Sequence, residues 1–149
     1  MENPTALDYL SDAGGVGALM RARDWSTSPL GPPESWPQSL RTIVSTLLKS
    51  RFAMFLWWGP ENIQFYNDGY ISSIGAERHP SGLGQRGEEC WAEIWPVIGP
   101  LVEHVRTTGE ATWAEDQLIP ITRGGILQEC FWTFSYSPIR DESGAVAGV

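Results

Sequence analysis

The segment from Ile126 to Asp141, ILQECFWTFSYSPIRD, is the longest strand-like run of the chain. It is dense in aromatic and β-branched residues and ends at a proline and a polar turn, a pattern typical of strands. Side chains of a strand point alternately to its two faces, so Trp132, Phe134 and Tyr136 share one face. The other face is mostly small and hydroxylic. The aromatic face needs a core, a partner or a ligand to cover it.

Composition narrows the partners that this strand can have. The 149 residues are 42% hydrophobic, which suffices for the core of one domain, with or without an appendage. A net charge of −8 and a pI near 4.6 argue against nucleic acid, which requires a basic face. No apolar run reaches the length of about 18 residues that membrane insertion needs. Cys90 and Cys130 stand apart without a CxxC motif, so we expect reduced, buried thiols in a cytoplasmic protein.

The clearest helix signal covers residues 35–50. Ser35 with Gln38 three positions later has the spacing of a capping box, and Pro37 fits the first turn. The apolar residues then recur at helical spacing and form the stripe Leu40, Ile43, Val44, Leu47 and Leu48. We expect this stripe to pack on a sheet or on a second copy of the helix, and it is our candidate dimerisation face.

The remaining segments predict an α+β fold. Strands are expected at 52–58 and 63–66, as a hairpin, and then at 112–122, 126–141 and from Ala145; helices are expected at 67–74, 88–95 and from Pro100 to about Gly109. This order favours one antiparallel sheet with helices across one face. The last strand has fewer residues than an average strand when it stops at Val149, so we expect the chain to be cut from a longer protein.

Several segments of this sequence resemble a PAS domain. The end of the chain, SPIRDESGAVAGV (Ser137–Val149), is similar to the PAS pattern of a strand, a polar turn and the last strand. FYNDGYISSIG (Phe65–Gly75) is similar to the junction of the second PAS strand with the first helix. Four further segments together resemble the N-terminal sensory PAS module of bacterial histidine kinases, namely DWSTSPLGPPESWPQSLRTIV, MFLWWGP, EIWPVIGP and TFSYSPIRD.

The resemblance implies a five-stranded antiparallel sheet with helices across one face and an N-terminal flanking helix. It places an N-terminal extension at residues 1–51 and a PAS domain at 52–149, truncated in its last strand. It also implies a sensor rather than an enzyme. The expected protein is a cytoplasmic homodimer that binds a small molecule or a partner and controls a kinase domain in the same chain.

The same resemblance, with the aromatic alternation, places a ligand pocket between sheet and helices. Its candidate residues are Phe55, Trp57, Tyr66, Trp91, Trp95, Ile98, Val102, Trp132, Phe134 and Tyr136. If buried, the Tyr136 hydroxyl and the tryptophan N–H groups need hydrogen-bond partners, which a ligand could supply. In the alternative interpretation these side chains fill a dry core.

No cofactor is assigned, although a small organic ligand fits the pattern. The reactive cysteine stretch of light-sensing LOV relatives is absent, because Cys90 lies in the sequence Glu-Cys-Trp-Ala. His104 falls beside the apolar stripe of its expected helix, a solvent or flank position that argues against haem ligation. No catalytic motif is present. Three hypotheses remain: a ligand sensor, a ligand-free dimerisation or interaction module, and a non-covalent flavin or haem sensor.

Overall fold

The computed structural model describes residues 7–11 and 14–149. A short hairpin forms the centre of the fold. Strands β1 (Phe55–Trp58) and β2 (Ile63–Tyr66) pair antiparallel, with Trp58 opposite Ile63 and Phe55 opposite Tyr66. Gly59, at a φ of 76°, and Asn62, at a φ of 52°, supply the left-handed conformations of the turn. The predicted hairpin is therefore confirmed.

The α+β class is confirmed, but the single five-stranded sheet is wrong for the described residues. A four-stranded antiparallel sheet runs in the order β2-β1-β8-β7, where β7 is Ile139–Arg140 and β8 is Val146–Gly148. Two separate two-stranded ribbons pair β3 (Ala114–Leu118) with β6 (Phe131–Phe134), and β4 (Ile121–Arg123) with β5 (Ile126–Gln128).

The two long strands predicted at 112–122 and 126–141 are interrupted. The structure has five shorter strands around these ranges, β3 to β7, and several of the breaks have identifiable causes. Asp116 takes a φ of 49° at an irregularity between Ala114 and Gln117, which bulges β3. Pro120 and Pro138 have no N–H and so cannot donate to a ladder. The two chain segments remain hydrogen-bonded between the β3–β6 and β4–β5 ribbons, since the Ile119 N–H donates to the Cys130 carbonyl at 2.9 Å.

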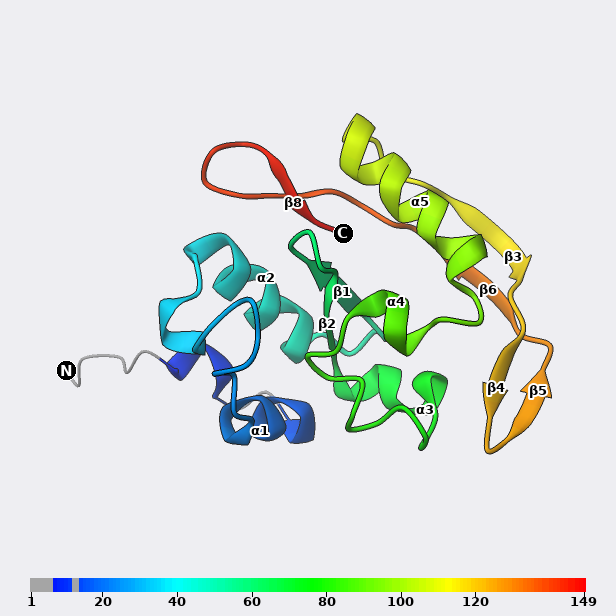
Figure 1. Cartoon of the computed structure of the whole chain (residues 1–149), viewed down its shortest axis with the longest axis horizontal. Coiled ribbons are helices and arrows are strands. Elements are labelled where there is room, and N and C mark those ends of the chain that lie inside the picture. Colours follow the sequence, from blue (N-terminus) through cyan, green and yellow to red (C-terminus); the bar gives the residue numbers. More distant parts are fainter. Residues whose placement is uncertain (1–6, 12–13) are drawn as a thin grey trace.

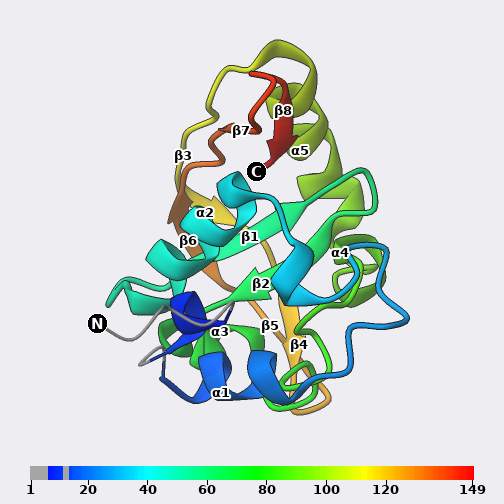
Figure 2. The ribbon, with the colours of Figure 1, turned by 90° about the vertical axis from the view of Figure 1, so that its left-hand side faces the viewer.

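Helices cover both faces of the main sheet, which corrects the prediction of one covered face. Figures 1 and 2 show α2 (Gln38–Lys49) on one side of β1 and β2, with α4 (Gly87–Cys90) and α5 (Trp95–Thr108) on the other. The strand alternation agrees with this arrangement. Phe65 packs against Trp25 and Trp36 from the N-terminal region, whereas Trp57 packs edge-on against Trp95 of α5.

The predicted α2 stripe is buried inside its own chain. Leu40, Val44, Leu47 and Leu48 are at most 5% exposed, and Ile43 is half-buried. The sheet and two N-terminal elements, η1 (Asp8–Leu10) and α1 (Gly14–Ala22), supply the contacts. The assignment of these five residues as a dimerisation face is therefore corrected, because four of them have no area left to give to a partner.

Side chains distant in sequence cap the helices. The predicted Ser35 capping box does not form, since Ser35 belongs to the 3₁₀ turn η2 (Pro33–Ser35) and its hydroxyl donates to the Pro32 carbonyl. Glu142 instead accepts from the Ser39 N–H at 2.7 Å and from its hydroxyl at 3.0 Å. Asp68 likewise accepts from the N–H groups of Gly15 and Val16 in α1.

Helix α5 differs from its prediction at its start. The sequence predicts a helix from Pro100, whereas α5 begins at Trp95 with Pro96 in its first turn and Pro100 inside it. A proline in the first turn costs little, because its missing N–H has no helical partner there. The end at Gly109 is confirmed: this residue takes a left-handed φ of 71° and its N–H donates to Val105. Between β2 and α4 the chain forms a 3₁₀ helix, η3 (Asp68–Tyr70), followed by a short α-helix, α3 (Ile71–Ile74).

The predicted division at residues 51 and 52 runs through shared packing. Leu10, Val16 and Met20 are fully buried in the same hydrophobic cluster as the strands. Trp25 stacks on Phe65 with ring centroids 5.8 Å apart.

None of the helices within the described residues, 7–11 and 14–149, is long and apolar enough to cross a bilayer.

Candidate ligand-binding pocket

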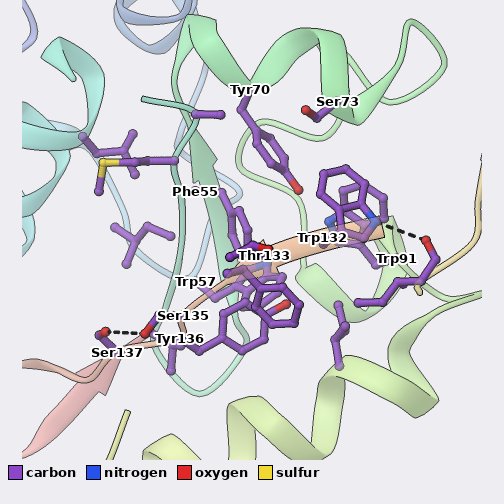
Figure 3. A pocket seen from close by; sticks show the side chains of 18 of the residues that line it. Phe55, Trp57, Tyr70, Ser73, Trp91, Trp132, Thr133, Ser135, Tyr136 and Ser137 are labelled. Carbon is purple, nitrogen blue, oxygen red and sulfur yellow. Dashed lines mark hydrogen bonds between the residues drawn. The ribbon is translucent and has the colours of Figure 1, made fainter. Parts of the chain in front are cut away.

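A cavity of about 450 Å³ lies where the aromatic face of β6 meets β1 and the helices. Its volume is within the range of small-molecule sites. Figure 3 shows aromatic side chains from several elements gathered around it, with β6 running across the pocket. The predicted alternation of the strand is confirmed here: Trp132 and Phe134 are half-buried and Tyr136 is buried, while Phe131, Thr133 and Ser135 are exposed.

Seven of the ten predicted pocket residues line this cavity. They are Phe55, Trp57, Trp91, Ile98, Trp132, Phe134 and Tyr136. Their rings form a connected wall, in which Tyr136 meets Trp57 edge-on at 5.5 Å, Phe55 at 5.9 Å and Phe134 at 4.8 Å between centroids. This wall is aromatic and largely apolar, and it suits a flat or aliphatic ligand.

The other three predicted residues do not line the cavity. Tyr66 is fully buried in β2, and its hydroxyl lies 2.7 Å from His79 Nδ1. Burial raises the pKa of Tyr66 to about 12, so the hydroxyl stays protonated and can donate to that nitrogen. Trp95 supports the wall from behind by packing on Trp57. Val102 is buried within the core further along α5.

The tryptophan N–H groups do not need a ligand, contrary to the prediction. Gln64 of β2 accepts from Trp57 Nε1 at 3.0 Å and from Trp91 Nε1 at 2.9 Å through the same side-chain oxygen. Its amide nitrogen donates to the Gly82 carbonyl and to Cys90 Sγ. Trp132 Nε1 donates to the Ile119 carbonyl at 3.1 Å. The indoles are therefore locked in place before any ligand arrives.

Two tyrosine hydroxyls at the cavity remain without such a partner. Within residues 7–11 and 14–149, neither the Tyr70 nor the Tyr136 hydroxyl makes a hydrogen bond, and no buried side-chain oxygen or nitrogen is unsatisfied. Both hydroxyl oxygens are therefore accessible from the cavity. Burial raises the pKa of each well above its ordinary value, so both are donors at neutral pH. Figure 3 shows the Tyr70 hydroxyl directed toward Trp132.

Sequence reasoning missed Tyr70 and most of the aliphatic lining. The missed lining includes Ile43, Leu47, Met54, Ile94, Ile119, Ile121 and Ile139. Tyr70 is the last residue of the short 3₁₀ helix η3, which follows β2. Ile119 and Ile121 flank Pro120 in a bend, and no periodicity indicates on which side of a bend a residue will lie.

Other candidate groups lie away from the cavity. His104 is exposed, as predicted, and its Nε2 lies 4.0 Å from Glu110. Both cysteines are free; Cys90 is buried and Cys130 half-buried, and burial raises the pKa of the Cys90 thiol. No group of three or more metal-ligating side chains comes together among the described residues.

Comparison with known proteins adds no family assignment. No model of a known protein family matches the sequence, and no curated protein matches it significantly. The geometry of the cavity therefore has to carry the functional argument.

Proposed function

We propose that this chain is a sensory domain that binds a small, largely apolar molecule carrying at least one hydrogen-bond acceptor. The observation that carries this proposal is the pair of unpartnered hydroxyls, Tyr70 and Tyr136, on an otherwise apolar aromatic cavity of about 450 Å³. The surrounding rings provide contact area, and the two hydroxyls provide orientation. A filled, dry core would leave neither the space nor the two donors.

The order of the elements and the PAS-like motifs support placing this binding event in signalling. In this proposal the domain is the input module of a two-component sensor, and the controlled partner is a histidine kinase domain. Ligand contacts with β6 and with Tyr70 would favour one packing of the β3–β6 ribbon against the sheet. A ligand that binds one packing better than the other shifts the population between them.

The binding test uses conservative removal of each hydroxyl. A panel of aromatic and aliphatic carbonyl, quinone and phenol compounds is screened by thermal shift, and hits are measured by calorimetry. Tyr70→Phe or Tyr136→Phe should weaken a hit by about 2–12-fold, the equivalent of one lost hydrogen bond. Tyr9→Phe is the matched control, because the Tyr9 hydroxyl donates to Pro33 away from the cavity. Equal affinity in all three variants, or a panel without a single hit, would contradict the proposal.

A further inference from the structure

A further free hydroxyl lies on the helical side of the cavity. The Ser73 side chain of α3 lines the cavity and makes no hydrogen bond within residues 7–11 and 14–149. Ser73 follows Tyr70 by three positions, a spacing that places two side chains on the same face of a helix. Figure 3 shows both side chains on the same side of the pocket. Two free hydroxyls are therefore available on this side, in addition to the Tyr136 hydroxyl from the end of β6.

No charged side chain lines the cavity among the residues that the structure describes. The lining consists of aliphatic and aromatic side chains and of the hydroxyl groups of serine, threonine and tyrosine. Tyr70 and Tyr136 are the lining residues whose side chains can titrate, and burial raises the pKa of both. Neither is ionised at neutral pH. The cavity therefore offers a ligand hydrogen-bonding dipoles but no side-chain counter-ion.

One ion pair lies against the cavity wall without entering the lining. The Arg78 guanidinium lies over the Trp91 ring, 4.7 Å from its centroid. It pairs with Glu93 and donates to the carbonyls of Cys90 and Thr122. Neither Arg78 nor Glu93 lines the cavity. The two charges neutralise each other behind Trp91, so neither is offered to a ligand.

The cost of removing water decides which molecules such a cavity can hold. A carboxylate or an ammonium group loses its hydration on entry, and without a counter-ion this loss favours the uncharged form of the group. A neutral carbonyl group loses much less hydration, and hydrogen bonds from hydroxyls replace the lost bonds to water. Its oxygen has two lone pairs, so it can accept from two hydroxyls together.

We propose that the cavity selects uncharged carbonyl compounds, of the aromatic ketone, ester and amide class, and excludes the ionised forms of the related acids and amines. The carbonyl oxygen accepts from Tyr70 and Ser73, and the ring of the ligand lies among the aromatic side chains around Trp57 and Tyr136. A carboxylic acid enters only in its protonated form. This inference rests on the proposed function and adds the charge state and the functional group of the ligand.

The test compares three compounds that share one ring system, namely methyl naphthoate, naphthoic acid and naphthylmethylamine. Calorimetry with the full chain gives their dissociation constants between about pH 5.5 and about pH 7.5, a range in which the amine stays ionised. The ester should bind equally at every pH. An aromatic carboxyl group has a pKa of about 4, so the affinity of the acid should fall about tenfold for each pH unit. The amine should bind far more weakly than the ester throughout.

A serine pair tests the carbonyl contact itself. Ser73→Ala should weaken binding of the ester by about 2–12-fold, the equivalent of one lost hydrogen bond. Ser72→Ala is the matched control, because Ser72 is exposed and does not line the cavity. It should bind the ester as the unsubstituted chain does.

Two results would overturn this inference and leave the proposed function standing. One is an acid or an amine that binds as tightly as the ester at neutral pH, since the cavity would then hold a counter-ion. The other is unchanged binding of the ester by Ser73→Ala. If none of the three compounds binds, the carbonyl class is wrong. The proposed function fails only if the wider panel of neutral compounds also gives no hit.

Discussion

At the scale of single residues, two buried amides organise the interior. Gln64 fixes the indoles of Trp57 and Trp91 on the cavity side of β2. Asn67 acts at the end of the same strand. Its side-chain nitrogen donates to the carbonyls of Leu47, Ser50 and Phe52, and its oxygen accepts from the Met54 N–H. One amide thus joins the end of α2 to both central strands.

Replacing Asn67 should therefore be costly. We expect Asn67→Ala to lower the free energy of unfolding by about 2–4 kcal/mol, because it removes the hydrogen bonds that the amide makes to three carbonyls and one N–H. Urea unfolding followed by tryptophan fluorescence measures the loss. Asn67→Asp should be at least as destabilising, since a carboxylate would face the same carbonyls. Gln38→Ala, which removes an exposed bond to Thr42, should stay within about 0.5 kcal/mol. A much smaller loss of unfolding free energy in Asn67→Ala would mean that water replaces the hydrogen bonds of the amide.

At the scale of elements, α2 depends on the β7–β8 turn for its N-terminus. Glu142 accepts two hydrogen bonds from Ser39, and the Ser39 backbone bond is the main cause that holds the pKa of Glu142 below its usual value of 4.5. A carboxyl group with a lowered folded-state pKa stabilises the fold above its unfolded pKa. That contribution is lost as the pH falls through the folded value.

The Glu142 contact predicts a pH-dependent difference between two chains. Glu142→Gln should be less stable than the unsubstituted protein at pH 7, and the difference should shrink as the pH falls below 4.5, where Glu142 itself becomes protonated. Denaturant unfolding at several pH values measures this difference. Glu129→Gln, which replaces an exposed acid in the two-residue segment between β5 and β6, is the control and should show no such trend. A stability difference between the two chains that increases as the pH falls would contradict the capping role of Glu142.

At the scale of the whole molecule, the apolar stripe of α2 belongs to the core and not to an interface. We expect Leu40→Ala and Leu47→Ala each to lower stability by about 2–5 kcal/mol, the usual cost of a buried leucine. Neither should change the oligomeric state at a protein concentration where the variant stays folded. Chemical unfolding and sedimentation velocity together test this. Dissociation of a dimer without loss of monomer stability would restore the stripe as an interface. Lys49→Ala, exposed on the same helix, is the control.

The sequence by itself determined the features that depend on local periodicity. The alternation of residues 131–136, the helical spacing of the α2 stripe and the left-handed cap at Gly109 each follow from steric rules that act within a few residues. Alternation also places Trp132, Phe134 and Tyr136, three of the seven predicted residues that line the cavity, on one face. The other four, Phe55, Trp57, Trp91 and Ile98, were expected from the resemblance.

Only the tertiary structure decided which distant groups meet. Ser39 and Glu142 are 103 positions apart, and no local pattern links them. The shared partner of the Trp57 and Trp91 indole N–H groups and the accessible hydroxyls of Tyr70 and Tyr136 depend likewise on how the elements pack. Hydrogen bonding is satisfied by proximity in space, and a hydrophobic stripe indicates that it will be buried without indicating against what. For the α2 stripe the answer was its own sheet.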